Sequence, residues 1–241
     1  MITKRLSIVG ACVLLIIFLV VSISSALRES LTYDEIVAVE AGNDAWRKKD
    51  FSRDTNVPPL MREIAVLPSV LGFTVYSPYP NIRELPARMV TIVLGLMLGF
   101  AIYAIAQLFF GREAGLLVLF LYVFEPNILA NSHYITQDIG ATLLFFLTYM
   151  LLVKVLEKPN LKLFVLLGVV SGLMAASKIT VVFYFLVSML GLTAFQFRKN
   201  SETIWKYKGS IVFAIVIALF TIWSTYFFKT NVIVASGGNT E

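Results

Sequence analysis

The sequence has little charge for its length, with 15% charged residues against 58% hydrophobic ones in a chain of 241. In soluble domains about a quarter of the residues are charged. A water-soluble protein of this size could not bury so much apolar surface, so we expect lipid to surround most of the chain. The net charge of +5 lies in short basic clusters between apolar runs. This pattern indicates topology signals and lipid headgroup contacts, and it argues against nucleic-acid binding.

The sequence is also poor in the residues that build familiar soluble active sites. It contains one cysteine, Cys12, and one histidine, His133, which excludes an intrachain disulfide and a histidine metal cluster. No glycine-rich nucleotide-binding motif is present. We therefore expect no cofactor, although a divalent metal in an oxygen-rich site of glutamate, histidine and aspartate is an open alternative.

Long apolar runs are what the sequence does have, and they predict an all-α polytopic membrane protein. A membrane-spanning helix needs about 20 apolar residues. We predict about seven spans in a single membrane domain, residues 1–241, at 6–27, 86–110, 114–130, 135–156, 161–177, 179–197 and 210–228. The fifth and sixth runs are almost continuous, so we expect a tight hairpin between them with Lys178 at its tip.

Basic residues set the expected orientation, because cytoplasmic loops are enriched in lysine and arginine. With the N-terminus inside, the short inner segments carry most of them: Lys4, Arg5, Arg112, Lys154, Lys158, Lys162, Arg198, Lys199, Lys206 and Lys208. The loop 28–85 and the C-terminal tail are then outside. We expect an integral protein of a bacterial plasma membrane, with its functional face outside.

The outer loop 28–85 is too long to lack structure, and we predict two or three short amphipathic helices in it. Thr32 and Glu35 fit a capping box that opens a helix toward Trp46. Pro59 fits the first turn of a second helix. The segment 59–76 is apolar over about 12 residues, so we interpret it as an interfacial or re-entrant helix and not as a span.

The adjacent carboxylates Asp34 and Glu35 come shortly after the first span and are the first candidates for chemistry. One of them could act as a general base facing a membrane-embedded cavity. The alternative is that they only cap the helix, with Glu35 bonded to Thr32 and Asp34 favoured at the helix N-terminus. These two roles are compatible.

Four further ionisable residues lie at the expected outer surface. His133 and Asp138 flank the junction between the third and fourth spans, where they could serve a site or cap a helix. Lys178 and Arg88 could bind a lipid phosphate, or they could anchor their helices at the headgroups. The Pro58-Pro59 pair stiffens the loop in front of the second short helix.

These motifs occur in an order that resembles membrane glycosyltransferases of the GT-C class, family 39 type. That family includes protein O-mannosyltransferases and lipid A aminoarabinose transferases. The matching stretches are Leu31-Thr-Tyr-Asp-Glu35, Val57-Pro-Pro-Leu60, Leu85-Pro-Ala-Arg88, Leu129-Ala-Asn-Ser-His-Tyr-Ile-Thr-Gln-Asp138, and Gly168 to Lys178. The chain departs from the family pattern where Val57 and Asn131 replace histidines and His133 replaces an arginine.

The resemblance implies a GT-C-like bundle and an inverting transfer of a sugar from a polyprenyl-phosphate donor. It implies that Asp34 is the base, assisted by Glu35, and that the donor phosphate is bound by Lys178, His133 and Arg88. Asp138, Pro58 and Pro59 would position the substrates. The acceptor could be a protein, a lipid or a glycan.

Two further expectations concern how complete and how active the chain is. Its seven helices correspond to the module that the family shares, so we expect a partial enzyme with a possible C-terminal partner half. The competing class is a non-catalytic membrane protein, a transporter or scaffold fragment. In that case the acidic pair is only a helix cap and Lys178 only reaches the headgroups.

Overall fold

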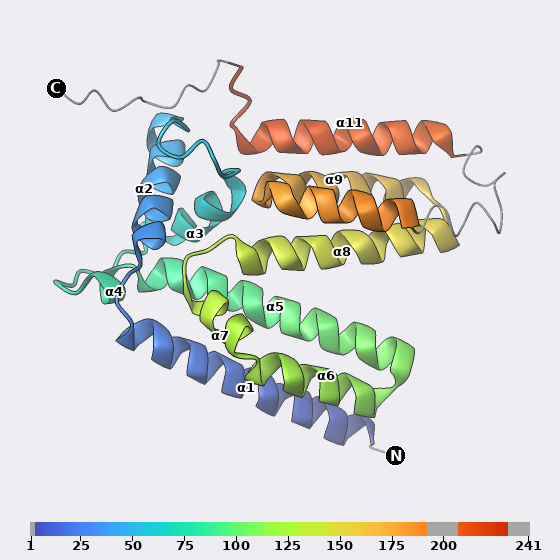
Figure 1. Ribbon diagram of the computed structural model, residues 1–241, viewed down its shortest axis with the longest axis horizontal. Coiled ribbons are helices and arrows are strands. Elements are labelled where there is room, and N and C mark those ends of the chain that lie inside the picture. Colours follow the sequence, from blue (N-terminus) through green and yellow to red (C-terminus); the bar gives the residue numbers. More distant parts are fainter. Residues whose placement is uncertain (1–2, 192–206, 231–241) are drawn as a thin grey trace. The chain divides into compact units, whose positions relative to one another are not determined.

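The computed structural model describes residues 3–191 and 207–230, and every regular element in these ranges is a helix (Figure 1). The prediction of an all-α polytopic membrane protein is therefore confirmed. The helices are α1 (Lys4–Arg28), α2 (Tyr33–Lys48), α3 (Leu60–Val70), α4 (Pro80–Arg83), α5 (Leu85–Phe110), α6 (Arg112–Phe124), α7 (Pro126–His133), α8 (Asp138–Glu157), α9 (Leu161–Ser177), the segment Ile179–Gly191 and α11 (Lys208–Thr225).

Each predicted span coincides with a helix or a helix pair. Within the described residues, four helices are long and apolar enough to cross a membrane, namely α1, α5, α8 and α11, and the bent pair α6 and α7 raises this to five if it is one span. The helix α9 and the segment Ile179–Gly191 are shorter, so seven crossings stay a prediction. The end of the predicted span 179–197 and the basic residues Arg198, Lys199 and Lys206 lie outside the described residues.

The predicted span 114–130 is bent by 64° where α6 meets α7. Pro126 has no N–H to continue the helix and disfavours helical geometry at the residue before it. Glu125 accordingly adopts an extended conformation, and its carboxylate accepts a hydrogen bond of 2.7 Å from the Ile128 amide. The residues that break one helix therefore cap the next.

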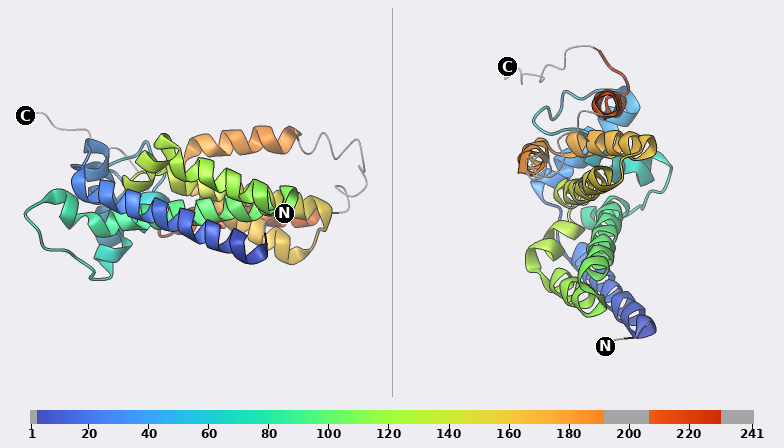
Figure 2. Two further views of the ribbon diagram at one scale, coloured as in Figure 1. Left: turned by 90° about the horizontal axis from the view of Figure 1, so that it is seen from below. Right: turned by 90° about the vertical axis from the view of Figure 1, so that its right-hand side faces the viewer.

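The chain folds as two compact units, and each is described by itself. The first contains residues 1–43 and 62–143, and the second contains 44–61 and 144–241. In the first unit α1, α5 and α6 pack side by side (Figures 1 and 2). Tyr122 of α6 donates a hydrogen bond of 2.7 Å to the Gly95 carbonyl of α5, and its ring lies 5.5 Å from that of Phe18 of α1.

The predicted short helices of the outer loop are present as α2 and α3. The capping box of α2 is confirmed, since the Thr32 amide donates to Glu35 at 2.9 Å and the Glu35 amide donates to the Thr32 hydroxyl at 3.3 Å. The helix α3 begins just after Pro59 and is about 16 Å long at 1.5 Å per residue, too short to cross a bilayer. Its location at the membrane surface stays a prediction.

In the second unit, part of the outer loop packs on the end of α11 through aromatic side chains. The ring of Trp46 lies 5.0 Å from Phe227, and that of Phe51 lies 5.1 Å from Tyr226. The Lys229 ammonium donates a hydrogen bond of 2.9 Å to the Lys49 carbonyl. These contacts hold the loop residues that follow α2 against the last described helix.

The helices α9 and α11 pack closely because glycines remove side chains from their interface. A Cβ atom on Gly168 would lie 2.6 Å from the Ala214 carbonyl oxygen, and one on Gly172 would lie 2.6 Å from that of Ala218. In lipid, where hydrophobic burial does not drive helix association, such small residues at a spacing of four allow backbones to approach. The break at Lys178 is as predicted, because α9 ends at Ser177 and a new helix begins at Ile179.

We predict that Gly172→Ala weakens the packing of α9 on α11 by about 1–3 kcal/mol, because its methyl group would overlap a backbone carbonyl. Thermal unfolding in detergent measures the effect. Gly191→Ala is the matched control, since a Cβ there has open space around it. Equal melting temperatures for the two variants would contradict the close approach.

Candidate active site

A cluster of polar and charged side chains forms at one end of the first unit. It joins the end of α1, the start of α2, the start of α5 and the junction between α7 and α8. At its centre is an ion pair between Glu35 and Arg88, whose side chains are both fully buried. The guanidinium donates two parallel hydrogen bonds to the carboxylate, 2.8 Å from Nε and 2.9 Å from Nη2. Such bidentate pairs combine charge with fixed geometry.

Glu35 accepts three hydrogen bonds besides those from Arg88. Its Oε2 takes the amide and the hydroxyl of Thr32, at 2.9 and 3.2 Å, and its Oε1 takes the Ile135 amide at 3.1 Å. Burial by itself would raise the pKa of Glu35. The hydrogen bonds from Arg88 and from the amides of Thr32 and Ile135 outweigh burial and hold its pKa below the usual value. Glu35 is therefore ionised at neutral pH.

Arg88 has all five of its N–H donors engaged within the protein. Besides Glu35, it donates to the carbonyls of Ala26, Glu29 and Ser30 at 2.7, 2.9 and 3.0 Å. The last carbonyls of a helix lack partners within the helix and carry partial negative charge, so a guanidinium at the end of α1 is well placed. Arg88 was predicted to bind the donor phosphate, and this arrangement leaves it no free donor for that.

A second group of side chains lies beside this ion pair. Glu29, directly after α1, accepts hydrogen bonds from the Tyr134 hydroxyl and from His133 Nε2, the latter at 3.0 Å. These bonds, that from Tyr134 above all, lower the pKa of Glu29, and the carboxylate in turn raises the pKa of the Tyr134 phenol. His133 Nδ1 lies 2.8 Å from the Leu129 carbonyl. Both nitrogens of the only histidine thus face acceptors.

Glu29 is the residue that sequence reasoning missed. Its only signal was an acidic side chain at the outer end of the first span, with no motif around it. Its main partners, His133 and Tyr134, lie more than 100 residues away along the chain. No local pattern connects residues so far apart.

Asp34 lies in the first turn of α2, between the two residues of the capping box, and it is exposed. Consecutive helical residues point about 100° apart, so Glu35 can enter the cluster while Asp34 faces away from it. The two carboxylates that look alike in the sequence therefore have different environments. Glu35 is held in an ion pair, and Asp34 is exposed.

The remaining predicted residues are divided between the units. Asp138 is the first residue of α8, in the first unit, where a carboxylate suits a helix N-terminus. Lys178, Pro58 and Pro59 belong to the second unit. Lys178 lies in an extended conformation between two helices, and Pro59 is fully buried directly before α3. Within the described ranges, no group of three or more His, Cys, Asp or Glu side chains could hold a metal ion.

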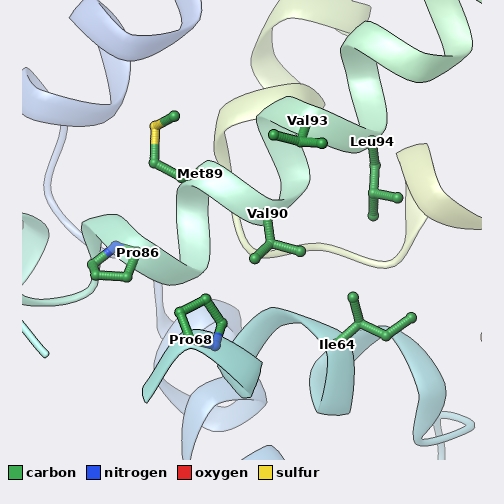
Figure 3. A pocket seen from close by; sticks show the side chains of 7 residues that line it. All are labelled: Ile64, Pro68, Pro86, Met89, Val90, Val93 and Leu94. Atoms are coloured by element: carbon green, nitrogen blue, oxygen red, sulfur yellow. The ribbon is translucent and has the colours of Figure 1, made fainter. Parts of the chain in front are cut away.

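An apolar groove of about 470 Å³ lies between α3 and the outer part of α5 (Figure 3). Ile64 and Pro68 of α3 face Val90 and Leu94 of α5 across it. The lining is completed by Pro86, Met89 and Val93, so it contains no polar side chain. Because Pro86 and Met89 flank Arg88 in the sequence, the groove and the ion pair share the same turns of α5.

We predict that Arg88→Met destabilises the protein by about 3–5 kcal/mol, because it leaves the Glu35 carboxylate buried without its cation. Thermal or denaturant unfolding in detergent measures this loss. Arg83→Met is the matched control. Arg83 is more than half exposed in its ion pair with Glu84, and we expect its removal to cost less than about 1 kcal/mol. A similar cost for both variants would contradict the central role of the buried pair.

Comparison with known proteins identifies the family of the chain. The family model described as dolichyl-phosphate-mannose-protein mannosyltransferase matches residues 80–223, which is more than half of the chain. Searches of curated proteins and of solved structures returned no match. The matched region contains Arg88, His133, Asp138 and Lys178, whereas Asp34 and Glu35 precede it. An integral membrane chain with this match belongs to the dolichyl-phosphate-mannose-protein mannosyltransferase family, a family of GT-C type glycosyltransferases.

Proposed function

We propose that the protein transfers a sugar from a polyprenyl-phosphate donor to an acceptor at the outer membrane face, with inversion at the anomeric carbon. The observation that carries this proposal is the exposed Asp34, presented by a helix whose first turn is fixed by the buried Glu35–Arg88 pair. The family match from residue 80 onward supports sugar transfer as the reaction class.

In the proposed reaction Asp34 accepts the proton of the acceptor's nucleophilic group. The nucleophile then forms a bond to the anomeric carbon as the bond from that carbon to the phosphate oxygen breaks. The lipid phosphate leaves with the electron pair of the broken bond, and Asp34 later releases its proton to water. A carboxylate suits this role because its oxygens can accept a proton, and Asp34 reaches the surface.

The departing phosphate gains charge, and a cation near it would lower the barrier. We propose Lys178 for this contact, since an ammonium group is a compact point charge for phosphate. Arg88 and His133 already use their donors inside the protein, so we propose that they support the site and do not bind the phosphate directly. We further propose that Asp138, Pro58 and Pro59 help to position the substrates.

The apolar groove between α3 and α5 supports a donor with a hydrocarbon chain. Its lining of aliphatic, proline and methionine side chains offers no hydrogen bond to a sugar or a peptide. Its volume lies within the range of about 300–1,000 Å³ that is usual for small-molecule sites. We propose that it takes part of the polyprenyl chain near the phosphate.

We predict that Asp34→Asn lowers sugar transfer by at least about 100-fold, because the amide cannot accept the acceptor's proton. The measurement is transfer from a radiolabelled polyprenyl-phosphate sugar in membranes, with expression and melting temperature checked alongside. Glu40→Gln, an exposed change on the same helix, should leave transfer intact. Wild-type turnover by Asp34→Asn would exclude this residue as the base.

We predict that Lys178→Ala lowers kcat by about 100-fold through loss of phosphate stabilisation, and that Lys178→Arg restores part of the rate. Lys162→Ala, at the other end of α9, is the matched control and should keep the wild-type rate. If Lys178→Ala and Lys162→Ala behave alike in the transfer assay, Lys178 only anchors its helix at the lipid headgroups.

A further inference from the structure

The outer ends of α1 and α7 are tied together by a three-residue network, Glu29, His133 and Tyr134. The His133 side chain is almost fully buried, whereas the Glu29 side chain is 41% exposed. Among the described residues, His133 contacts the Glu29 carboxylate at 3.0 Å and the Tyr134 ring at 4.4 Å, and the Arg88 guanidinium lies on the far side of Tyr134, 5.8 Å from its ring. The network therefore lies between the surface and the buried ion pair.

Both ring nitrogens of His133 lie close to hydrogen-bond acceptors. Its Nδ1 lies 2.8 Å from the Leu129 carbonyl oxygen, and its Nε2 lies 3.0 Å from the Glu29 carboxylate. Neither partner has a proton to donate, so each ring nitrogen must supply one. Only the doubly protonated imidazolium can do this, and a neutral ring would lose one of the two hydrogen bonds.

The network is connected to Asp34 through a short covalent and hydrogen-bonded path. The residue after Tyr134 is Ile135, whose amide donates to Glu35. The Glu29 carbonyl accepts from Arg88, which holds the other side of Glu35. Glu35 in turn caps the turn of α2 that carries Asp34.

We propose that Glu29, His133 and Tyr134 are positioning residues for the reaction, and that they hold Asp34 in place only while His133 is protonated. This proposal rests on the proposed function. The family pattern that the chain resembles has an arginine where this chain has His133. Under the proposal, this difference affects how activity depends on pH. An arginine is permanently charged, whereas an imidazole can be charged or neutral. The site of this chain should accordingly lose activity as the pH rises.

The test compares the pH dependence of sugar transfer in the wild type, four variants and one control variant. Glu29→Gln and His133→Gln should lower kcat by about tenfold while the KM for the polyprenyl-phosphate sugar stays the same, because the base is misplaced and the donor site is intact. Tyr134→Phe is a milder change in case Glu29→Gln fails to fold, and it should lower kcat less. Glu84→Gln, an acidic residue outside the network, is the control.

The fourth variant, His133→Arg, separates charge from mere structure. It should be active and should keep its rate at alkaline pH, where the wild type loses activity. If His133→Arg is as slow as His133→Gln, or if His133→Gln has the wild-type rate and pH profile, the proposal is wrong. Unchanged kcat in both Glu29→Gln and Tyr134→Phe would also overturn it.

A second measurement keeps this test separate from that of the proposed function. Hydrogen exchange of peptides covering residues 30–36 and 133–137, corrected for intrinsic rates, reports on the Ile135 amide and the first turn of α2. Protection should fall in Glu29→Gln and His133→Gln and persist in His133→Arg. If the wild type transfers no sugar, the proposed function fails. In that case hydrogen exchange alone tests whether the network positions α2. Unchanged protection in Glu29→Gln and His133→Gln would overturn that role of the network.

Discussion

The buried ion pair between Arg88 and Glu35 organises one end of the first unit. Removing two charges from water is costly, and the cost is recovered only if every donor and acceptor finds a partner. Here the guanidinium makes five hydrogen bonds and the carboxylate accepts five. Moving any of these partners would leave a charge or a polar group buried without compensation. The pair thereby fixes the segments that supply its partners.

Three segments depend on this pair. Arg88 holds the end of α1 by donating hydrogen bonds to the carbonyls of Ala26, Glu29 and Ser30. Glu35 holds the start of α2 through its capping box with Thr32. The Ile135 amide ties the junction between α7 and α8 to the same carboxylate. Glu35 and Asp34 are adjacent in the sequence, yet one builds this framework and the other stays exposed on it. This arrangement suits the proposed role of Asp34, because catalysis by positioning requires a reactive group on a fixed support.

The sequence motifs identified candidate residues, and the structure showed which of these residues contact one another. The sequence singled out Glu35, Arg88 and His133, and the structure brings these three together. It also changes the roles that we propose for them, because their polar groups are used within the protein. The family match begins at residue 80 and so includes Arg88 and His133 but not the acidic pair. The link between the matched region and Asp34 is therefore supplied by hydrogen bonds across the fold.

The sequence by itself determined the features that depend on neighbouring residues. Apolar runs become helices because lipid leaves backbone groups no other partners, the Thr32 to Glu35 spacing starts α2, and Pro126 breaks the third span. Tertiary structure alone decided the partners of charged groups. Arg88 and Glu35 are 53 residues apart, and Glu29 is 104 residues from His133. Such pairs leave no local pattern, because they exist only once the helices have packed and excluded water.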